Sequence, residues 1–305
     1  MPTRTVEKQI KVDQCDGKTR LDKYVSSLKE IPRSVFQDRD IQISVNGKKE
    51  KKSFIVHEGD LVSLTYTERY FEGIKAEAIP LQVIYEDADV LVINKAQGMV
   101  VHPAAGNWEG TLVGALLFRY GEQWAEEEDA LRPGIVHRLD KDTSGTMVIA
   151  RNPLSQRRLE EQFKDHTTHK VYIAIVKGII ASDHGVIETG IKRCERDRKK
   201  YGTCPLGEGK RAYTEYRVLK RYAACTLVRI VIQTGRTHQI RVHMSSIGHP
   251  VVGDPIYGKH SDGVGLLLHA FILSFDQPTT GRRLTFHSPM PQRFKDYLKA
   301  RRSRT

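Results

Sequence analysis

Hydrophobic and polar positions follow two different patterns along the chain, and the pattern changes near residue 80. In the first part, residues 21–28 carry apolar side chains at helical spacing, and Pro32 suits the start of a second short helix. Residues 41–45 then alternate between apolar and polar, and Asn46-Gly47 is typical of a hairpin turn. The first part is therefore predicted to form two short helices followed by short strands.

From Pro80 onward, apolar strands and amphipathic helices are mixed, which predicts a mixed α/β domain. The predicted strands cover residues 81–85, 90–93, 146–150, 170–178 and 225–233, and the predicted helices cover 111–120, a segment starting at Asn152-Pro153, and 238–247. Asn152 is the expected N-cap of its helix, with Pro153 in the first position. Thr237 is expected to cap the last helix, and Gly248 to end it.

The two patterns suggest two domains. Residues 68–79 mix charged and aromatic side chains without periodicity and are expected to be a linker. The predicted domains are then residues 1–67 and residues 80–305, the second ending in a basic tail that starts at Arg293.

Composition and charge narrow the choice of partner. The chain of 305 residues has 49 Lys and Arg against 37 Asp and Glu, a net charge of +12. Such a balance favours an anionic partner, most commonly nucleic acid, although it also simply keeps proteins soluble. The cysteines are sparse and form no paired C-x-x-C, which speaks against a zinc site and fits a reducing compartment. Without a secretory signal or a membrane-spanning run, we expect a cytoplasmic protein with no membrane partner.

One stretch carries candidate chemistry: His137-Arg138-Leu139-Asp140-Lys141-Asp142-Thr143-Ser144-Gly145. It lies between the apolar residues 134–136 and the predicted strand 146–150, so we expect a loop between two strands. Thr, Ser and Gly in succession suit a tight turn. Such a loop would present the Asp140 carboxylate beside the cationic Arg138. The alternative interpretation is that Asp140 caps the turn and pairs with Arg138 at the surface.

The stretch resembles the signature of the RluA-type pseudouridine synthases, His-Arg-Leu-Asp followed two residues later by Thr-Ser-Gly. Residues 94–107, 234–247 and 253–258 are also similar to that family, although Ala96 stands where a Pro is usual. The sequence from His102 to Asn107, His-Pro-Ala-Ala-Gly-Asn, is most similar to the RluD branch, which acts on large-subunit ribosomal RNA. The resemblance extends from Arg20 to about Phe286. It implies an α+β fold for residues 80–305, with a mixed, mainly antiparallel sheet, residues 266–270 as a further core strand, and flanking helices.

The first domain is similar to the small S-four RNA-binding domain, a small α/β fold. The matching residues are Arg20-Leu21-Asp22-Lys23-Tyr24, Arg33-Ser34, Val45-Asn46-Gly47-Lys48 and Glu58-Gly59-Asp60, with a stretch between Gln37 and Asn46 that is shorter than usual. The candidate RNA-binding residues are Arg20, Lys23, Arg33, Lys48 and Lys49. Such side chains would contact phosphates, which anchor RNA without reading its sequence. A solvated basic loop is the alternative.

The family resemblance implies a reaction and three catalytic residues. A pseudouridine synthase breaks the N-glycosidic bond of a uridine, turns the base and rejoins it through carbon, and the isomerisation needs no cofactor or metal. Asp140 is implied to be the nucleophile, attacking either the anomeric carbon or the base. Because an isolated buried carboxylate tends to protonate, a cation must stabilise it, and Arg241 in His-Gln-x-Arg-Val-His is implied. Tyr172, in a Lys-x-Tyr-x-Ala setting, is implied to pack on the uracil and to assist removal of the carbon-5 proton. By its residue type alone, Tyr172 could equally be a core tyrosine.

The expected partner is RNA, namely 23S ribosomal RNA or a ribosomal precursor particle, bound by a monomer. Arg138 is implied to fill the space that a flipped uridine leaves, and His137, Arg236 and His238 are further candidates for RNA contact. The basic stretch 192–200 is expected to form a mobile hairpin or loop that contacts the RNA backbone or is simply solvated. Three alternatives remain open: a transfer RNA substrate, a catalytically idle RNA-binding protein, and a glycoside or nucleoside hydrolase, which would need a second catalytic carboxylate.

Overall fold

The computed structural model describes residues 3–13, 15–28, 31, 35–36, 41–69, 74–103, 107–121, 133–195, 197, 199–258 and 263–301. The chain forms two compact units, Met1–Gly73 and Ile74–Thr305. The division falls inside the stretch that was expected to be a linker. The first two residues of that stretch belong to strand β4 (Leu61–Arg69). Near its end, the backbone N–H of Glu77 donates to the carbonyl of Gly114 in the second unit.

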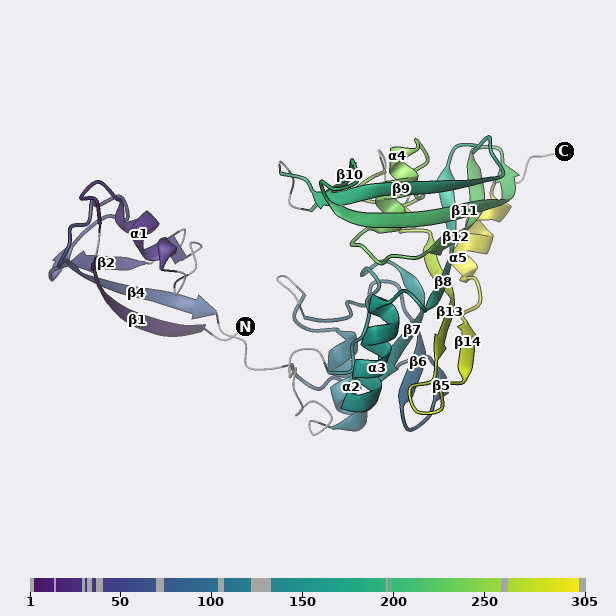
Figure 1. Ribbon diagram of the computed structural model, residues 1–305, viewed down its shortest axis with the longest axis horizontal. Helices are drawn as coiled ribbons and strands as arrows, with labels where there is room; N and C mark the ends of the chain where they lie inside the picture. The colour runs from purple at the N-terminus through teal and green to yellow at the C-terminus, as the bar shows by residue number, and fades with distance from the viewer. Residues whose placement is uncertain are drawn as a thin grey trace. The chain divides into compact units, whose positions relative to one another are not determined.

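The first unit contains a four-stranded antiparallel sheet (Figure 1). Its strand order is β1 (Thr3–Lys11), β4, β2 (Gln42–Val45) and β3 (Lys48–Lys49). Asn46 and Gly47, both at positive φ, form the turn between β2 and β3, as the Asn-Gly pair predicted. Strand β1 was not predicted, because charged residues dominate its sequence and only its pairing with β4 gives it a place in the sheet.

The core of the first unit lies between this sheet and helix α1 (Leu21–Ser27), which was predicted. Leu21 and Val25 are fully buried and share the core with Val62 and Leu64 of β4. Most of the second short helix predicted from Pro32 lies outside the described residues.

The second unit is built on one large mixed sheet with the order β10-β9-β11-β12-β8-β13-β7-β6-β5, and β14 pairs with β13 (Figure 1). Its strands are β5 (Val83–Glu86), β6 (Val90–Lys95), β7 (Ser144–Ala150), β8 (His169–Lys177), β9 (His184–Arg193), β10 (Tyr201–Cys204), β11 (Lys210–Tyr222), β12 (Cys225–Ile232), β13 (Leu268–Asp276) and β14 (Arg283–His287). Strands β7 and β13 pair in parallel, and the other neighbouring strands pair antiparallel. The expected α+β fold with a mixed, mainly antiparallel sheet is confirmed.

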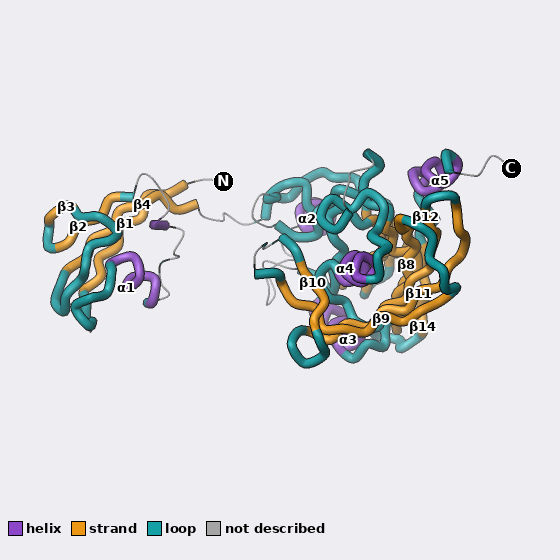
Figure 2. Tube along the Cα trace, turned by 90° about the horizontal axis from the view of Figure 1, so that it is seen from above, coloured by secondary structure: helices purple, strands orange, loops and turns teal. Residues whose placement is uncertain are grey.

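Helices cover both faces of this sheet (Figure 2). They are α2 (Leu112–Tyr120), α3 (Pro153–Lys164), α4 (Gln239–Ser246) and α5 (Gln292–Lys299). Helices α2 and α4 contribute to the same core as Tyr172, Ala174 and Val176 of β8. Ile173 and Ile175, which alternate with them, share a different core with α5. The predicted alternation along this strand is therefore confirmed, and it places Tyr172 on the α4 face.

Side-chain caps start two of the helices, α2 and α3. Thr111 accepts the backbone N–H of Gly114, and Asn152 accepts that of Ser155 with Pro153 next in the chain, so α2 and α3 begin as predicted. The prediction that Thr237 caps α4 is wrong. The N-cap is His238, which has a left-handed backbone with φ of 57° and makes no side-chain capping bond.

The short parallel pairing of β7 with β13 brings distant segments together. Ala270 of β13 pairs with Gly145 on one side and with Tyr172 on the other. Gly145 has φ of +124°, and a Cβ there would lie 2.2 Å from the carbonyl oxygen of Ala270, so a side chain cannot be accommodated. The loop before β7, which carries Asp140, is thereby held beside the strand that carries Tyr172.

The segment before that loop differs from the expectation. Residues 135–143 have no regular strand or helix, and the preceding element along the described chain is α2. The loop therefore follows an irregular segment and, within the described residues, is not directly preceded by a strand. Among the described residues, no helix is long and apolar enough to cross a membrane.

Candidate active site

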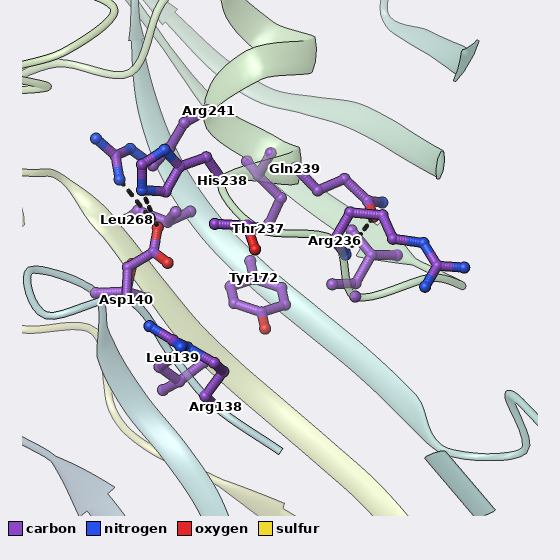
Figure 3. A pocket seen from close by; sticks show the side chains of 14 residues that line it. Arg138, Leu139, Asp140, Tyr172, Arg236, Thr237, His238, Gln239, Arg241 and Leu268 are labelled. Atoms are coloured by element: carbon purple, nitrogen blue, oxygen red, sulfur yellow. Dashed lines mark hydrogen bonds and ion pairs between the residues drawn. The ribbon is translucent and has the colours of Figure 1, made fainter. Parts of the chain in front are cut away.

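Asp140 lies in a tight turn at the mouth of a pocket in the second unit. The backbone carbonyl of Asp140 accepts the N–H of Thr143 at 3.0 Å, which closes the turn before β7. Its side chain is 21% exposed and lines the pocket with Arg138, Tyr172 and Arg241 (Figure 3). The structure therefore brings together the three side chains that were predicted to be catalytic.

Arg241 connects Asp140 to a second carboxylate. The Nη1 of Arg241 donates to Oδ2 of Asp140 at 3.0 Å, while its Nε and Nη2 donate to the two oxygens of Asp254 at 2.7 and 2.9 Å. Arg241 is only 6% exposed and Asp254 is fully buried. Burial disfavours the Arg241 cation, but the hydrogen bonds and charge of Asp254 outweigh this and raise the pKa of Arg241, with a further contribution from Asp140. The cation beside Asp140 is thus permanent.

Asp254 was not predicted as a site residue. Burial opposes its ionisation, yet the hydrogen bonds and charge of Arg241 hold the pKa of Asp254 below its ordinary value. Its Oδ1 also accepts the backbone N–H groups of Ile256 and Tyr257. The sequence contained a hint, since Gly253-Asp254-Pro255 lies in a stretch similar to the family, but no local spacing relates this Asp to Arg241.

Tyr172 lies in an apolar part of the pocket. Tyr172 is 9% exposed, and Ile232 and Leu268 line the pocket with it. Burial raises the pKa of Tyr172, and the negative charge of Asp140 raises it further, so the phenol stays protonated at neutral pH. Figure 3 shows its ring facing the space between Asp140 and Thr237, an arrangement that could hold a flat base.

The residues of this unit that were predicted to contact RNA divide into two groups. Arg138, Arg236 and His238 line the pocket, and Arg138 is exposed. His137 does not line it. Its Nε2 accepts the N–H of Val148, its ring stacks on Phe163 at 4.4 Å, and burial lowers its pKa to about 3. These contacts hold the His137 ring within the fold, and its RNA contact stays a prediction.

The buried Lys95 stabilises the Asp140 loop through hydrogen bonds to backbone carbonyls, and it was not predicted as a site residue. It is 1% exposed, and its Nζ donates to the carbonyls of Ala96, Met99 and Lys141. Lys141 follows Asp140 directly, so Lys95 fixes the backbone of the turn. Burial lowers the pKa of Lys95 to about 8, opposed by the charges of Asp142 and Asp140.

A basic groove adjoins the pocket. The predicted hairpin is present, formed by β9, β10 and β11, and its residues Lys192, Arg193 and Lys210 line the groove. The groove and the pocket share the loop of residues 235–237 as a common wall. Lys192 pairs with Glu208 at 3.0 Å, which partly offsets the positive charge.

In the first unit, the predicted RNA-binding residues differ in their availability. Lys23, Lys48 and Lys49 are exposed. Arg20 forms a two-bond ion pair with Asp22, at 3.0 and 2.9 Å. Arg33 lies outside the described residues.

The pocket suits chemistry by a single carboxylate. The second carboxylate, Asp254, is fully buried and bonded to Arg241 through both oxygens, so it cannot act as the separate acid that a glycoside hydrolase requires. In the described part of the chain, no three His, Cys, Asp or Glu side chains are grouped so that they could hold a metal ion.

Comparisons with known proteins agree with this arrangement. Residues 89–246 match the family model described as RNA pseudouridylate synthase. The chain is 42% identical over 278 residues to the uncharacterized RNA pseudouridine synthase YlyB of Bacillus subtilis (strain 168), covering 90% of this chain and 91% of that protein. It is 40% identical to ribosomal large subunit pseudouridine synthase D of Borreliella burgdorferi, covering 92% of this chain and 88% of that protein. Among solved structures, human RNA pseudouridylate synthase domain containing 1 matches with a TM-score of 0.57 and 27% identity, covering 74% of this chain and 96% of that chain.

Fold and site thus define an enzyme class, the RNA pseudouridine synthases, which are isomerases. The chain belongs to the RNA pseudouridylate synthase family, and it resembles the RluD branch in particular.

Proposed function

We propose that this protein converts a specific uridine of large-subunit ribosomal RNA to pseudouridine in the cytoplasm, acting as a monomer with Asp140 as the nucleophile. The single observation that carries the proposal is the ion pair of Asp140 with the buried Arg241, beside the pocket that contains Tyr172. The choice of RNA rests on relatives from several bacteria whose name is ribosomal large subunit pseudouridine synthase D.

The depth of the pocket requires the target uridine to leave the RNA stack. Tyr172 is 9% exposed, so a base paired within a helix cannot reach its ring. Everting a nucleotide costs a few kcal/mol, and less where the base is already unpaired. In this proposal Arg138, which is exposed and lines the pocket, fills the position that the uridine vacates.

The reaction then moves one bond and conserves all atoms. The bond between the anomeric carbon and N1 of the uracil breaks while Asp140 forms a covalent bond with the anomeric carbon or with the base. The base turns, its carbon 5 bonds to the anomeric carbon, and Asp140 is released. The proton on carbon 5 is lost and N1 gains a proton. Arg241 keeps the carboxylate in place throughout.

Tyr172 is assigned two roles in this scheme. Its ring packs on the uracil, which explains why an aromatic side chain lines an otherwise apolar part of the pocket. Because its pKa is raised, no phenolate is available as a standing base. Its hydroxyl therefore assists removal of the carbon-5 proton as a relay: the oxygen accepts that proton while the hydroxyl gives its own to water, from which N1 takes the proton that it gains.

The first unit is proposed to act as an S-four-like RNA-binding domain. Lys48 and Lys49 are consecutive exposed residues of strand β3, next to the turn at Asn46-Gly47. Their charges suit contact with phosphates, which would add affinity that falls as salt concentration rises.

The proposal is tested first on the RNA. Pseudouridines are mapped in ribosomal and transfer RNA from cells with and without this protein, and one or more large-subunit positions are expected to depend on it. Dependence confined to transfer RNA would replace the proposed substrate. No dependence in either RNA would support an idle RNA-binding protein.

The nucleophile is tested with the purified protein. Asp140→Asn keeps the size of the side chain and removes the charge, so we expect pseudouridine formation on the mapped RNA to fall below detection while the Kd for that RNA changes less than about threefold. Lys299→Gln, at an exposed position on α5, serves as the control and should match the wild type. Equal loss of binding and activity in Asp140→Asn would assign Asp140 a structural role.

A further inference from the structure

Asp140 has a second neighbour besides Arg241. The Nε2 of His238 lies 3.8 Å from Oδ2 of Asp140, the same oxygen that accepts the hydrogen bond from Arg241 (Figure 3). Within the described part of the chain, Oδ1 accepts no hydrogen bond. The two oxygens of the carboxylate are therefore unequal: one faces two nitrogen-bearing side chains, and the other is open to the pocket.

The backbone at His238 is unusual for a residue with a side chain. His238 is the N-cap of α4 and has φ of 57°, in the left-handed region that side chains seldom adopt. Its ring does not cap the helix. The conformation instead accompanies a ring held between Asp140 on one side and Tyr257 on the other.

Tyr257 determines which ring nitrogen of His238 carries the proton. The Oη of Tyr257 lies 2.9 Å from Nδ1 of His238 and accepts the backbone N–H of Tyr201 at 3.0 Å. Among the described residues, Nδ1 of His238 is the acceptor within reach of the Tyr257 hydroxyl hydrogen, and we assign that hydrogen to it. Nδ1 is then an acceptor, and the ring proton sits on Nε2, facing Asp140.

We propose that His238 is a positioning residue for the Asp140 nucleophile: its Nε2–H, oriented by Tyr257, lies 3.8 Å from Oδ2 and closes to a hydrogen bond on that oxygen when the uridine is bound, so that Oδ1 is left as the oxygen that bonds to the uridine. This inference rests on the proposed function. One donor on one oxygen leaves the carboxylate free to rotate about its Cβ–Cγ bond. Once the Nε2–H of His238 approaches to hydrogen-bond distance, a second donor on the same oxygen restricts that rotation, and a misplacement of about 1 Å can cost about 10²-fold in rate.

The charge state of the ring fits this role. Burial lowers the pKa of His238, opposed by the charge of Asp140, with Arg241, Asp254 and Arg138 as the other charged groups that act on it. A neutral ring directs a donor at Asp140 without adding a second full positive charge, which would make the carboxylate a weaker nucleophile.

Three variants distinguish a positioning role of the His238 side chain from a role in RNA binding and from a role in folding. His238→Leu removes the donor, His238→Gln keeps an N–H near the position of Nε2, and Tyr257→Phe removes the hydroxyl that orients the ring. Tyr257→Phe retains the ring that packs edge-on to His238 and lies under Arg241. His184→Gln, at an exposed position on β9, is the matched control.

Single-turnover rates and the Kd for the RNA are measured for each variant. We expect the rate to fall about 10²-fold in His238→Leu and about tenfold in Tyr257→Phe, with the Kd within about threefold, and His238→Gln to recover most of the rate. A loss confined to the Kd would overturn the proposal in favour of an RNA contact. Equal losses in His238→Leu and His238→Gln would overturn it in favour of a packing role.

A spectroscopic readout does not depend on catalysis. Nitrogen-15 NMR of the RNA-free protein should show His238 protonated on Nε2, with that preference lost in Tyr257→Phe. Protonation on Nδ1 in the wild type would overturn the proposal even if the enzyme is active. If the wild type formed no pseudouridine at all, the proposed function would fail, while the NMR result would still decide the orientation of the ring.

Discussion

Arg241 serves two carboxylates at once, and Asp254 is the partner that holds it in place. Two hydrogen bonds at 2.7 and 2.9 Å join the guanidinium to Asp254, against one at 3.0 Å to Asp140. Both Asp254 and Arg241 are buried. The position of the cation in the pocket therefore depends on Asp254, a residue that lines no part of the pocket itself.

Replacing Asp254 by Asn should damage both folding and catalysis. Removing one partner of a buried pair costs about 3 kcal/mol or more, because the charge left behind is poorly solvated. We expect that loss in the free energy of urea unfolding, together with a fall of more than about tenfold in the single-turnover rate. Asp276→Asn is the matched control, since Asp276 and its partner Arg283 are each 43% exposed and such pairs contribute at most about 1 kcal/mol. Similar stabilities for the two variants would contradict the structural role of Asp254.

Tyr172→Phe isolates the hydroxyl of Tyr172 from its ring. The phenol makes no hydrogen bond among the described residues, so stability and RNA affinity should be unchanged. The turnover should fall by about 10²-fold or more if the hydroxyl relays the carbon-5 proton. With RNA deuterated at carbon 5 of uridine, the variant should show a primary isotope effect larger than that of the wild type. Full activity would leave Tyr172 with stacking alone.

At the residue scale, family resemblance located Asp140, Tyr172 and Arg241, and the structure brings all three to one pocket. It did not reveal Asp254 or Lys95 as supports. Lys95 reaches the carbonyl of Lys141, and Arg241 reaches Asp254, across separations that no helical or strand period encodes. Such contacts exist only once the sheet has formed.

At the scale of elements, the sequence predicted best where the signal is local. Asn152-Pro153 starts α3 and Asn46-Gly47 turns the β2–β3 hairpin as expected. Strand β1 and helix α5 were missed, because both sequences are rich in charged residues. Strand β1 is stabilised by its pairing with β4, and α5 by the burial of its Phe294 and Leu298. The Thr237 cap failed because His238, held by its side-chain contacts, takes the cap position instead.

The pairing of β7 with β13 at Gly145 and Ala270 can be tested by a substitution in β7. Gly145→Ala would place a methyl group against the backbone of Ala270 and would strain a residue at φ of +124°. We expect a loss of more than about 3 kcal/mol in the free energy of unfolding, with loss of activity in parallel. Gly281→Ala is the control: its φ is +67°, but no atom lies within 4 Å of the added Cβ, so the cost should be about 1 kcal/mol. Equal effects would show that the strands can separate at this point.

At the scale of the whole molecule, buried neutral histidines couple stability to pH. His243 and His269 are fully buried, and burial lowers the pKa of each from 6.5 to about 4. Between pH 6.5 and pH 4 these histidines bind protons in the unfolded chain but not in the folded chain. Their contribution to the free energy of unfolding is therefore present above pH 6.5 and is lost as the pH falls towards 4.

The expected loss is about 2 kcal/mol for each of these histidines by pH 5, before most carboxylates titrate. Urea unfolding between pH 7 and pH 5 measures it. His269→Gln, which can keep hydrogen bonds to Ser144 and Ser288, should reduce the slope by at most about a third, because the buried His137 contributes to it along with His243. A flat profile in the wild type would show that the buried histidines accept protons without unfolding.

The double pairing of Arg241 has a consequence for the reaction as a whole. In the proposed reaction, Asp140 becomes an ester when it bonds to the nucleic acid, and it then carries no charge. Asp254 then still neutralises Arg241, so the interior holds no bare cation while the base turns. In this proposal, Asp140 can change from an anion to a neutral adduct and back without leaving an unpaired buried charge, because Asp254 stays paired with Arg241 throughout.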